Sequence, residues 1–414
     1  MAKDTLYIAI TGHVDHGKST LIGRLLIDTG SLPKDKMDEL NKISRELGKD
    51  AELAYLTDQL KEEREENKTI DTTQTFIKTK KRDFVIIDTP GHTEFLKNML
   101  TGASMASAAV LIVDAHEGIM EQTRRHAYLL SMIGIEDIII VLNKMDIEKF
   151  DKVRFDKLSV DLLEIFGELD MEPAYMIPIS AREGINIMKR SKEMDWYKGP
   201  TLIEALGSIK IDAISSRKPL RFPVQDVYDI DEKKVLVGGV SSGTISRGQK
   251  VILMPSNQKA GISSIKLFEG EKDKAGEGEN IGVIIDKDIS LKRGDVIVEE
   301  SCANTPSSDL YGEVFWMANE PLKTGSKFTV RIATQETEGH VASIFKTIDA
   351  STLKVLEGNK DGIKQNEVGM VAIKTAKPVI SEDFSFIEEF GRFVIEKDNE
   401  LLGAGIVRTK GTCD

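Results

Sequence analysis

The chain has 414 residues, of which 40% are hydrophobic, 30% charged and 6% aromatic. This length is more than one hydrophobic core usually serves, so it favours two or three domains, and the composition excludes a disordered or low-complexity chain. The formal net charge of −12 argues against broad electrostatic attachment to nucleic acid, and the part from Ile214 onward, with 27 basic and 31 acidic residues, is only mildly acidic. The net charge does not exclude a local basic patch on the surface.

The sequence predicts a cytoplasmic protein that does not cross a membrane. It contains no apolar run of the ~18 residues that a membrane-spanning helix requires. The start of the chain, MAKDTLYIAI, lacks the charged, apolar and small-residue segments of a secretion signal. The two cysteines, Cys302 and Cys413, fit no zinc or redox spacing, so we expect reduced thiols.

Up to about residue 210, short apolar runs alternate with segments of helical length. This alternation predicts a mostly parallel sheet wrapped by helices, and continuous Val, Ile and Leu runs suit strands that are buried on both faces. We expect an α/β P-loop G domain over residues 1–213. The runs are Leu6–Ile10, Phe84–Ile87, Ala109–Val113, Ile138–Leu142 and Ala174–Ile179. Residues 28–68 interrupt the pattern with a highly charged, helix-favouring stretch, which reads most simply as a solvated helical insertion.

After SRKPLRFPV the helical periodicity gives way to short alternating runs separated by Gly, Asn, Asp and Pro. This pattern predicts two small β-barrel domains, over residues 214–303 and 304–414. In the first, VLVGGVSSGTISRGQKVILM reads as three strands with turns. In the second, the strand candidates are GEVFWMA, SKFTVRI, GHVASIF, GMVAIKT and GRFVIE.

The first chemical motif fits G-x-x-x-x-G-K-S/T, and it follows a strand and opens a helix, as a phosphate-binding loop requires. Its glycines let backbone amides close around phosphates, Lys18 reaches the β and γ oxygens, and Ser19 offers its hydroxyl to Mg²⁺. A chance match is the alternative, and the preceding strand argues against it. The predicted phosphate-binding residues here are Gly12, His13, Val14, Asp15, His16, Gly17, Lys18, Ser19 and Thr20.

A second motif, Asp88-Thr89-Pro90-Gly91, ends the second buried run. A carboxylate that emerges from an apolar run calls for a cationic partner, and Mg²⁺ supplies one for Asp88. Gly91 allows its backbone amide to approach the γ-phosphate closely because it has no Cβ. The alternative is that Asp88 is a simple turn former.

The third and fourth motifs predict a guanine site. Asn143-Lys144-Met145-Asp146 follows the fourth run, and the Asp146 carboxylate can accept from both the ring N–H and the exocyclic amine of guanine, which adenine cannot match. Ser180-Ala181 follows the fifth run and brings the Ala181 amide near the guanine oxygen. Asn143, Lys144, Asp146, Ser180 and Ala181 are thus the predicted base-binding residues, and the four motifs in this order predict a GTPase that uses GTP, GDP and Mg²⁺.

The runs HVDHGKST, DTPGH and NKMD resemble those of the translation-factor class of GTPases, and the two β blocks resemble the second and third domains of that class. The resemblance implies that Thr69 closes on Mg²⁺ when γ-phosphate is present. It also implies that His92 is the catalytic residue that orients the attacking water, which fits phosphoryl transfer, where positioning contributes most. A surface histidine that caps a helix is the alternative for His92.

Within this class the chain resembles the large, GTP-binding subunit of bacterial sulfate adenylyltransferase most. The stretches that carry the resemblance are STLIGRLLIDTG, LTDQLKEERE, QTRRHAYLL, WYKGPTLIEAL, RFPVQDV and VFWMANEPLKTG. It implies a smaller ATP-binding catalytic partner that joins sulfate to the AMP moiety of ATP to form adenylylsulfate, with GTP hydrolysis driving the step. No stretch resembles a fused adenylylsulfate kinase, so we expect no second enzyme.

Two features depart from that branch. His13 and His16 look more like an elongation factor, which leaves an elongation-factor-like GTPase that delivers aminoacyl-tRNA to the ribosome as the alternative, and a related GTPase of another pathway also stays open. Before Thr69 the family usually carries Gly and an aliphatic residue, whereas this chain has Asn67 and Lys68. A lysine cannot form an apolar gate without stranding its charge, so we expect Lys68 to alter the timing of hydrolysis.

Overall fold

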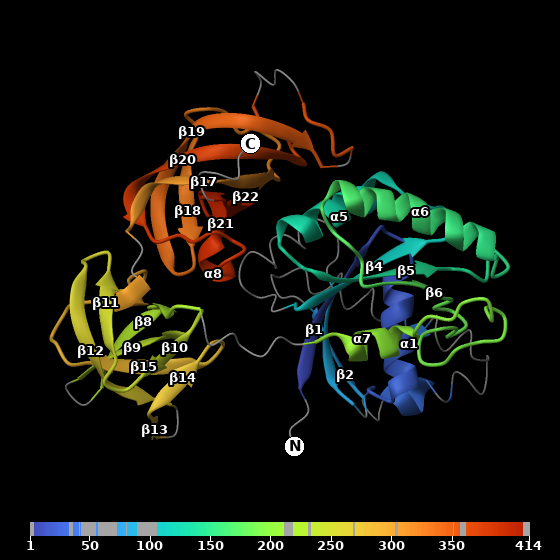
Figure 1. Cartoon of the computed structure of the whole chain (residues 1–414), viewed down its shortest axis with the longest axis horizontal. Coiled ribbons are helices and arrows are strands. Elements are labelled where there is room, and N and C mark those ends of the chain that lie inside the picture. Colours follow the sequence, from blue (N-terminus) through green and yellow to red (C-terminus); the bar gives the residue numbers. More distant parts are fainter. Residues whose placement is uncertain are drawn as a thin grey trace. The chain divides into compact units, whose positions relative to one another are not determined.

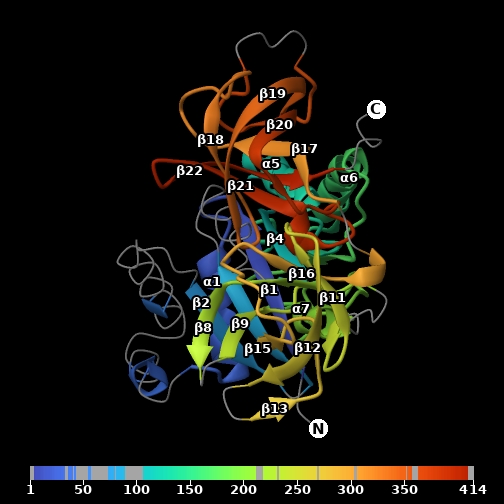
Figure 2. The same ribbon diagram turned by 90° about the vertical axis from the view of Figure 1, so that its left-hand side faces the viewer.

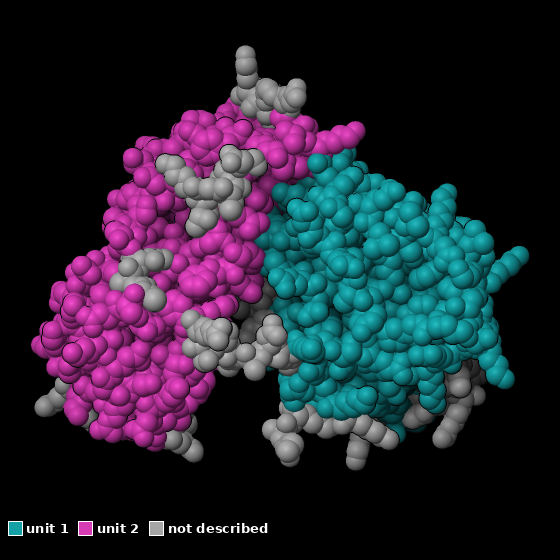
Figure 3. Space-filling model, viewed as in Figure 1, with its two compact units in different colours: residues 1–211, 350–353 teal, residues 212–349, 354–414 magenta. Residues whose placement is uncertain are grey.

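The computed structural model describes residues 4–32, 36–40, 42, 55–56, 73–79, 81–88, 106–210, 218–230, 233–267, 270–302, 305–350, 352–356 and 362–408. The chain divides into two compact units, residues 1–211 with 350–353 and residues 212–349 with 354–414 (Figure 3). Each unit is described by itself.

The first unit is an α/β layer structure, as the alternating apolar runs predict. Its described elements are β1 (Thr5–Gly12), α1 (Lys18–Thr29), β2 (Thr73–Lys78), β3 (Asp83–Asp88), β4 (Ala108–Asp114), α5 (Glu121–Met132), β5 (Asp137–Asn143), α6 (Lys152–Glu168), β6 (Tyr175–Pro178) and α7 (Leu202–Ser208). Of the charged insertion, residues 36–40 are helical, and most of the rest lies outside the described residues.

Six strands form one sheet in the order β2-β3-β1-β4-β5-β6. The strands from β3 to β6 in this order are parallel, and each of the five predicted runs lies in one of them. The edge strand β2 pairs antiparallel with β3 and was not predicted, because TQTFIK is short and largely polar. All seven residues of β4 are buried, as expected for a strand covered on both faces.

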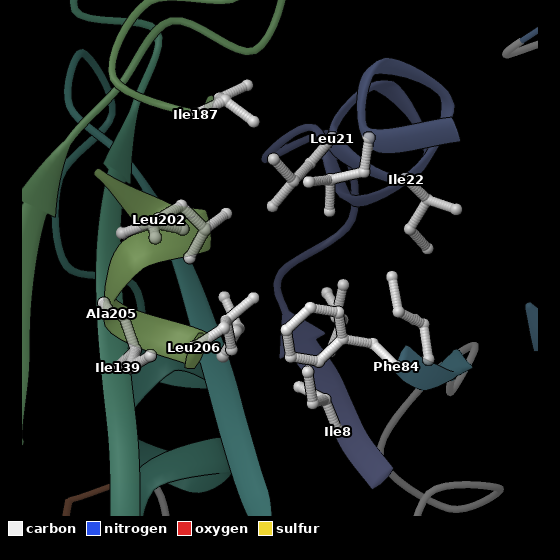
Figure 4. Packing of buried hydrophobic residues seen from close by; sticks show 14 of the residues in the cluster. Ile8, Leu21, Ile22, Phe84, Ile139, Ile187, Leu202, Ala205 and Leu206 are labelled. Atoms are coloured by element: carbon white, nitrogen blue, oxygen red, sulfur yellow. The ribbon is translucent and has the colours of Figure 1, made fainter. Parts of the chain in front are cut away.

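Helices cover both faces of this sheet, with α1 and α7 on one side and α5 and α6 on the other (Figures 1 and 2). Leu21 and Ile22 of α1 point toward Ile8 and Phe84 of the sheet (Figure 4). In α7, Ala205 lies beside Ile139 of β5, and Leu206 points toward Phe84 (Figure 4). Burying each such Leu, Ile or Phe side chain contributes about 1.5–3 kcal/mol of transfer free energy. This packing holds the strand ends, and the loops that follow them, in fixed positions.

The second unit is built from β-structure, which confirms the predicted fold class. Its strands are β7 (Arg221–Pro223), β8 (Asp226–Ile230), β9 (Lys233–Gly239), β10 (Thr244–Ser246), β11 (Lys250–Met254), β12 (Gln258–Lys266), β13 (Glu271–Lys272), β14 (Lys274–Gly276), β15 (Asn280–Ile285), β16 (Val296–Glu299), β17 (Ser307–Trp316), β18 (Lys327–Ile332), β19 (Gln335–Asp349), β20 (Glu367–Val379), β21 (Arg392–Lys397) and β22 (Glu400–Val407), with a short 3₁₀ turn at Glu300–Cys302 and the one-turn helix α8 (Glu388–Gly391).

These strands form two cores. The first has an eight-stranded sheet, in which seven strands follow the order β7-β16-β11-β12-β15-β9-β8 and β13 pairs with β12, together with the pair β10-β14. The second is a closed barrel in the order β17-β20-β19-β18-β21-β22. All the strand candidates quoted from the sequence form strands. No candidate was quoted for β7, β8 and β12 to β16 of the first core, nor for β22 of the barrel, where two glycines weaken a strand pattern.

The two cores of the second unit join through a small buried apolar cluster and one buried ion pair. The cluster brings Ile252, Met254, Val296 and Val298 of the sheet against Ile380, Ile387 and Phe390. At the start of β7, the Arg221 Nη2 atom lies 2.6 Å from the Glu382 Oε1 atom, and both side chains are almost fully buried. Within the described residues, no helix has the length and apolar character needed to cross a membrane.

Candidate functional site

The predicted site residues follow the carboxyl ends of the parallel strands. Gly12 ends β1, Asp88 ends β3, Asn143 ends β5, and Ser180 lies two residues beyond β6. Parallel strands bring these ends to one edge of the sheet, which is where open α/β sheets bind ligands. The loops at this edge form the candidate nucleotide site.

The loop from Gly12 to Gly17 has a backbone that only glycine supports at its two ends. Gly12 has a φ of +148°, and a Cβ there would lie 2.4 Å from the Ile112 carbonyl oxygen. Gly17 has a φ of +97° and lies close to Asn143. Both glycines therefore let the loop pass close to the neighbouring strand ends β4 and β5.

Helix α1 begins directly after this loop, so its first backbone amides point into it. The helix has no acidic residue in its first turn that would compete for an anion. The Lys18 ammonium group donates to the carbonyl oxygens of Gly12 and His13, at 2.6 and 2.8 Å, and so lies inside the loop. Ser19 is buried at the same helix start. A cation, a hydroxyl and helix amides together are donors that suit phosphate groups.

Helix α5 contacts the end of strand β1 and the start of the loop. The Nδ1 atom of His13 is hydrogen-bonded to the Oε1 atom of Gln122, and the Nδ1 atom of the buried His126 lies 2.8 Å from the Thr11 hydroxyl. Gln122 and His126 are four residues apart and therefore share one face of the helix. That face supports the end of β1 and the start of the loop.

His16 is fully buried beneath the loop. Its Nδ1 atom lies 3.3 Å from both the Ile112 carbonyl oxygen and the Asp114 amide nitrogen, and its Nε2 atom lies 3.4 Å from a Glu117 carboxylate oxygen. Burial lowers the pKa of His16 below its ordinary value of 6.5, more than its neighbours raise it. The ring is therefore neutral at pH 7 and serves as a packed support.

Asn143 joins the phosphate loop to the loop after β6. Its amide nitrogen donates to the His16 carbonyl oxygen at 2.9 Å, and its amide oxygen accepts from the Ala181 backbone amide at 2.9 Å. The side chain is buried, so both bonds lie away from competing water. Asn143 thus brings the first, third and fourth predicted motifs together.

Lys144 and Asp146 lie on the loop that leaves β5. The Lys144 Nζ atom lies 2.5 Å from the Oδ2 atom of Asp114, at the end of the neighbouring strand β4. The Asp146 side chain is half-buried, and Ser180 is fully buried with its hydroxyl accepting from the Glu183 amide at 3.2 Å. The predicted base-binding residues therefore share one corner of the sheet edge.

Other predicted residues cannot be placed. Thr69, Gly91 and His92 lie outside the described residues, as do Asn67 and Lys68 of the unusual segment. For Asp88 the structure gives the backbone, whose partner in the parallel register with β1 is Ile10, so the residue lies at the same sheet edge as the phosphate loop.

Several residues that shape this corner were not predicted as site residues: Thr11, Ile112, Asp114, Gln122 and His126. For Asp114 a signal existed, because VLIVD ends an apolar run on a carboxylate, which is the same pattern that singled out Asp88. The α5 contacts had no such signal, since Thr11 and His126 are separated by 115 residues in the chain.

Three family descriptions match the chain in succession. Residues 3–215 match the elongation factor Tu GTP binding domain, residues 234–298 match elongation factor Tu domain 2, and residues 310–408 match the GTP-eEF1A C-terminal domain-like family. Together they cover both units, and the first alone spans more than half of the chain.

Curated relatives match nearly the whole length. Sulfate adenylyltransferase subunit 1 of Erwinia tasmaniensis is 35% identical over 98% of this chain and 86% of the relative. The same subunit of Aeromonas hydrophila is 34% identical with the same coverage. Among solved structures, sup35 complexed with GDP has 24% sequence identity and a TM-score of 0.44 over 99% of this chain and 94% of that one. The chain is therefore a GTPase of the elongation factor Tu family, and it belongs to the branch whose bacterial members are named sulfate adenylyltransferase subunit 1.

Proposed function

We propose that this chain is the energy-coupling subunit of a sulfate adenylyltransferase. In this proposal a smaller, ATP-binding catalytic partner joins sulfate to the AMP moiety of ATP, and GTP hydrolysis on this chain drives adenylylsulfate formation. The observation that carries it is the match at 34–35% identity over 98% of the chain with relatives named as subunit 1 of that enzyme. A protein that is named as one subunit implies a second subunit. The sequence of this chain shows no second nucleotide-binding motif that could carry out adenylyl transfer.

The phosphate groups of GTP would lie against residues 12–20, which form the loop and the start of α1. Lys18 and the first amides of α1 neutralise and orient them, and this proposal is supported by the position of the Lys18 ammonium inside the loop. Glycines at both ends of the loop allow the backbone to approach the phosphates closely.

We assign the Mg²⁺ ligands to Ser19, Thr69 and Asp88. Oxygen donors suit this ion, and the buried Ser19 at the start of α1 and Asp88 at the end of β3 support the assignment because both leave the same sheet edge. When bound, Mg²⁺ neutralises charge on the β and γ phosphates.

The base would be read by Asp146, with Lys144 beside it and with the Ala181 amide toward the guanine oxygen. Support comes from Asn143, which joins the loop after β6 to the phosphate loop. Its amide oxygen accepts from the Ala181 amide, so contact with the base requires that N–H to exchange its bond to Asn143 for one to the guanine oxygen. Sites that use buried polar complementarity reject a partner without the matching groups by about 10⁴ or more.

His92 is proposed to orient the water that attacks the γ-phosphate, and Lys68 to change when hydrolysis occurs. For Lys68 the motivating observation is its position next to Thr69, where the family carries an aliphatic residue. GTP turnover of Lys68→Ile is expected to differ from that of the parent, measured by phosphate release with and without the catalytic partner. Equal rates in both conditions would remove the role of Lys68.

The function itself is tested by reconstitution. The purified chain is mixed with a candidate catalytic partner, a small ATP-binding protein, together with ATP, sulfate and GTP, and adenylylsulfate formation is followed. We expect GTP to increase product formation and Lys18→Ala to abolish the increase. If GTP has no effect and the chain instead binds aminoacyl-tRNA, the elongation-factor-like alternative replaces the proposal.

A further inference from the structure

The residue in question is Asp114, which the phosphate, magnesium and guanine motifs do not include. It ends strand β4, and its backbone lies opposite Asn143 in the parallel register with β5. Its side chain is 1% exposed. An ionised carboxylate at such a position is costly unless it is paired and hydrogen-bonded.

The two carboxylate oxygens of Asp114 have different partners. Oδ1 accepts from the backbone amides of His116 and Glu117, at 2.8 and 3.3 Å, and so closes the turn after β4. Oδ2 lies 2.5 Å from the ammonium nitrogen of Lys144. One oxygen therefore shapes the local turn, and the other reaches across to the guanine-binding motif.

The charge state of Asp114 agrees with this arrangement. Burial by itself would raise its pKa, but the hydrogen bonds from Lys144, His116 and Glu117 outweigh burial and hold the pKa below the usual 3.8. The carboxylate is therefore ionised at neutral pH, and the charge of Lys144 is balanced within the protein.

Lys144 needs such a restraint more than most residues. The backbone φ of Lys144 is +62°, in the left-handed region that residues other than glycine rarely adopt. Its side chain is 29% exposed. A lysine carries four rotatable side-chain bonds, and its free ammonium group would otherwise sample many positions in water. Binding that ammonium to Asp114 leaves the methylene chain in one direction.

We propose that Asp114 is a positioning residue for guanine nucleotide binding: it holds the Lys144 ammonium group so that the methylene chain of Lys144 forms a fixed side of the base site. This inference rests on the proposed base-binding role of Lys144 and extends it to a residue outside the four motifs. Asp114 touches no nucleotide in this scheme and acts through Lys144.

The test separates the two oxygens of Asp114. Asp114→Asn keeps an oxygen for the two turn amides and removes the charge that pairs with Lys144, and Asp114→Ser is a second variant that also keeps an acceptor. Affinities for GDP and GTP are measured by fluorescence titration on the full chain, with circular dichroism to check folding. We expect Asp114→Asn to weaken both by about tenfold to a hundredfold, the range that applies when a metal ligand loses the residue that orients it.

A double-mutant cycle distinguishes positioning from a general structural role. If Asp114 acts through Lys144, Asp114→Asn should cost little more once Lys144→Met is present. The KM for GTP should rise more than kcat falls, because the lost contact concerns binding. The matched control is Asp156→Asn on α6, which breaks the exposed Lys152–Asp156 pair, also 2.5 Å long, and should leave GDP affinity unchanged.

Measuring the preference for guanine over hypoxanthine separates a failure of this inference from a failure of the proposed base site. Asp146→Asn should reduce the preference for GDP over IDP, whereas Asp114→Asn should weaken both nucleotides equally. The role of Asp114 alone would be overturned if the parent chain, Asp114→Asn and Asp114→Ser all bound GDP equally well. Fully additive effects in the double-mutant cycle would overturn it too. Parent chain without guanine preference would overturn the base site itself.

Discussion

At the scale of single residues, Gly17 shows how closely the phosphate loop and the guanine motif are packed. A Cβ on Gly17 would lie 2.4 Å from the Asn143 amide nitrogen, and the φ of +97° disfavours any other residue. The same amide nitrogen donates to the His16 carbonyl oxygen. A methyl group at Gly17 therefore affects two motifs at once.

Gly17→Ala is expected to weaken GDP binding by at least about tenfold, equivalent to ~1.4 kcal/mol, because Asn143 must leave its bond to the loop. Fluorescence titration with GDP measures the effect. Gly167→Ala on helix α6, where an added Cβ meets nothing within 4 Å, is the control and should bind GDP normally. Normal GDP binding by Gly17→Ala would contradict this account of the loop.

His16 predicts a pH dependence of stability. Its pKa in the folded chain is lowered, so between the unfolded value near 6.5 and the lower folded value the unfolded chain binds a proton that the folded chain does not. Stability is therefore full above about pH 6.5 and falls as the pH drops through this window. The melting temperature should decrease less in His16→Gln than in the parent between about pH 7.5 and about pH 5.5. Identical pH slopes would show that His16 titrates normally.

At the scale of elements, helix α6 follows the guanine motif and depends on Asp151, the residue that precedes it and caps its start. The Asp151 carboxylate accepts from the backbone amides of Val153 and Arg154 at 3.1 and 3.3 Å, which satisfies two amides that have no partner within the helix. Arg154 in turn donates to the carbonyl oxygens of Ala115 and His116. The start of α6 thus braces the turn after β4 that the Asp114 carboxylate closes.

Asp151→Ala should lower stability by about 1 kcal/mol, the usual cost of losing a helix N-cap. For a unit of this size that corresponds to a decrease of about 2–4 °C in melting temperature, which calorimetry resolves. Asp151→Ser keeps a capping oxygen and should retain most of the stability. Equal melting temperatures for the Ala and Ser variants would mean that the cap contributes nothing.

At the scale of the whole molecule, the ion pair between Arg221 and Glu382 joins the two cores of the second unit across 161 residues of sequence. Two guanidinium nitrogens lie 2.6 and 2.8 Å from one Glu382 oxygen, and Arg221 also donates to the Leu220 carbonyl oxygen. A charge this deeply buried has no access to water that could replace its partner.

Glu382→Gln should destabilise the chain by about 3–5 kcal/mol, because it leaves Arg221 buried without a counter-charge. Urea denaturation measures the difference. The double variant Arg221→Met/Glu382→Leu replaces both charges with apolar groups and should recover much of the loss. A double variant that is less stable than Glu382→Gln would show that the ion pair stabilises the chain more than apolar side chains in its place.

Much of the fold could be predicted from the sequence, because its signals are local. The five buried parallel strands appear as continuous apolar runs, and the phosphate and guanine motifs each follow one of them. Among the strands that were not predicted, polar residues weaken the pattern in β2 and glycines weaken it in β22. Local periodicity carries little information about such strands.

The five buried parallel strands in chain order, the GTPase motifs and the family resemblance could thus be predicted from the sequence. Only the tertiary structure decided that Asp114 pairs with Lys144, that His126 supports Thr11, and that Arg221 meets Glu382. The physical reason is that such contacts depend on which strands become neighbours and in which register. Strand order and register follow from packing over the whole sheet, and no short stretch of sequence encodes them.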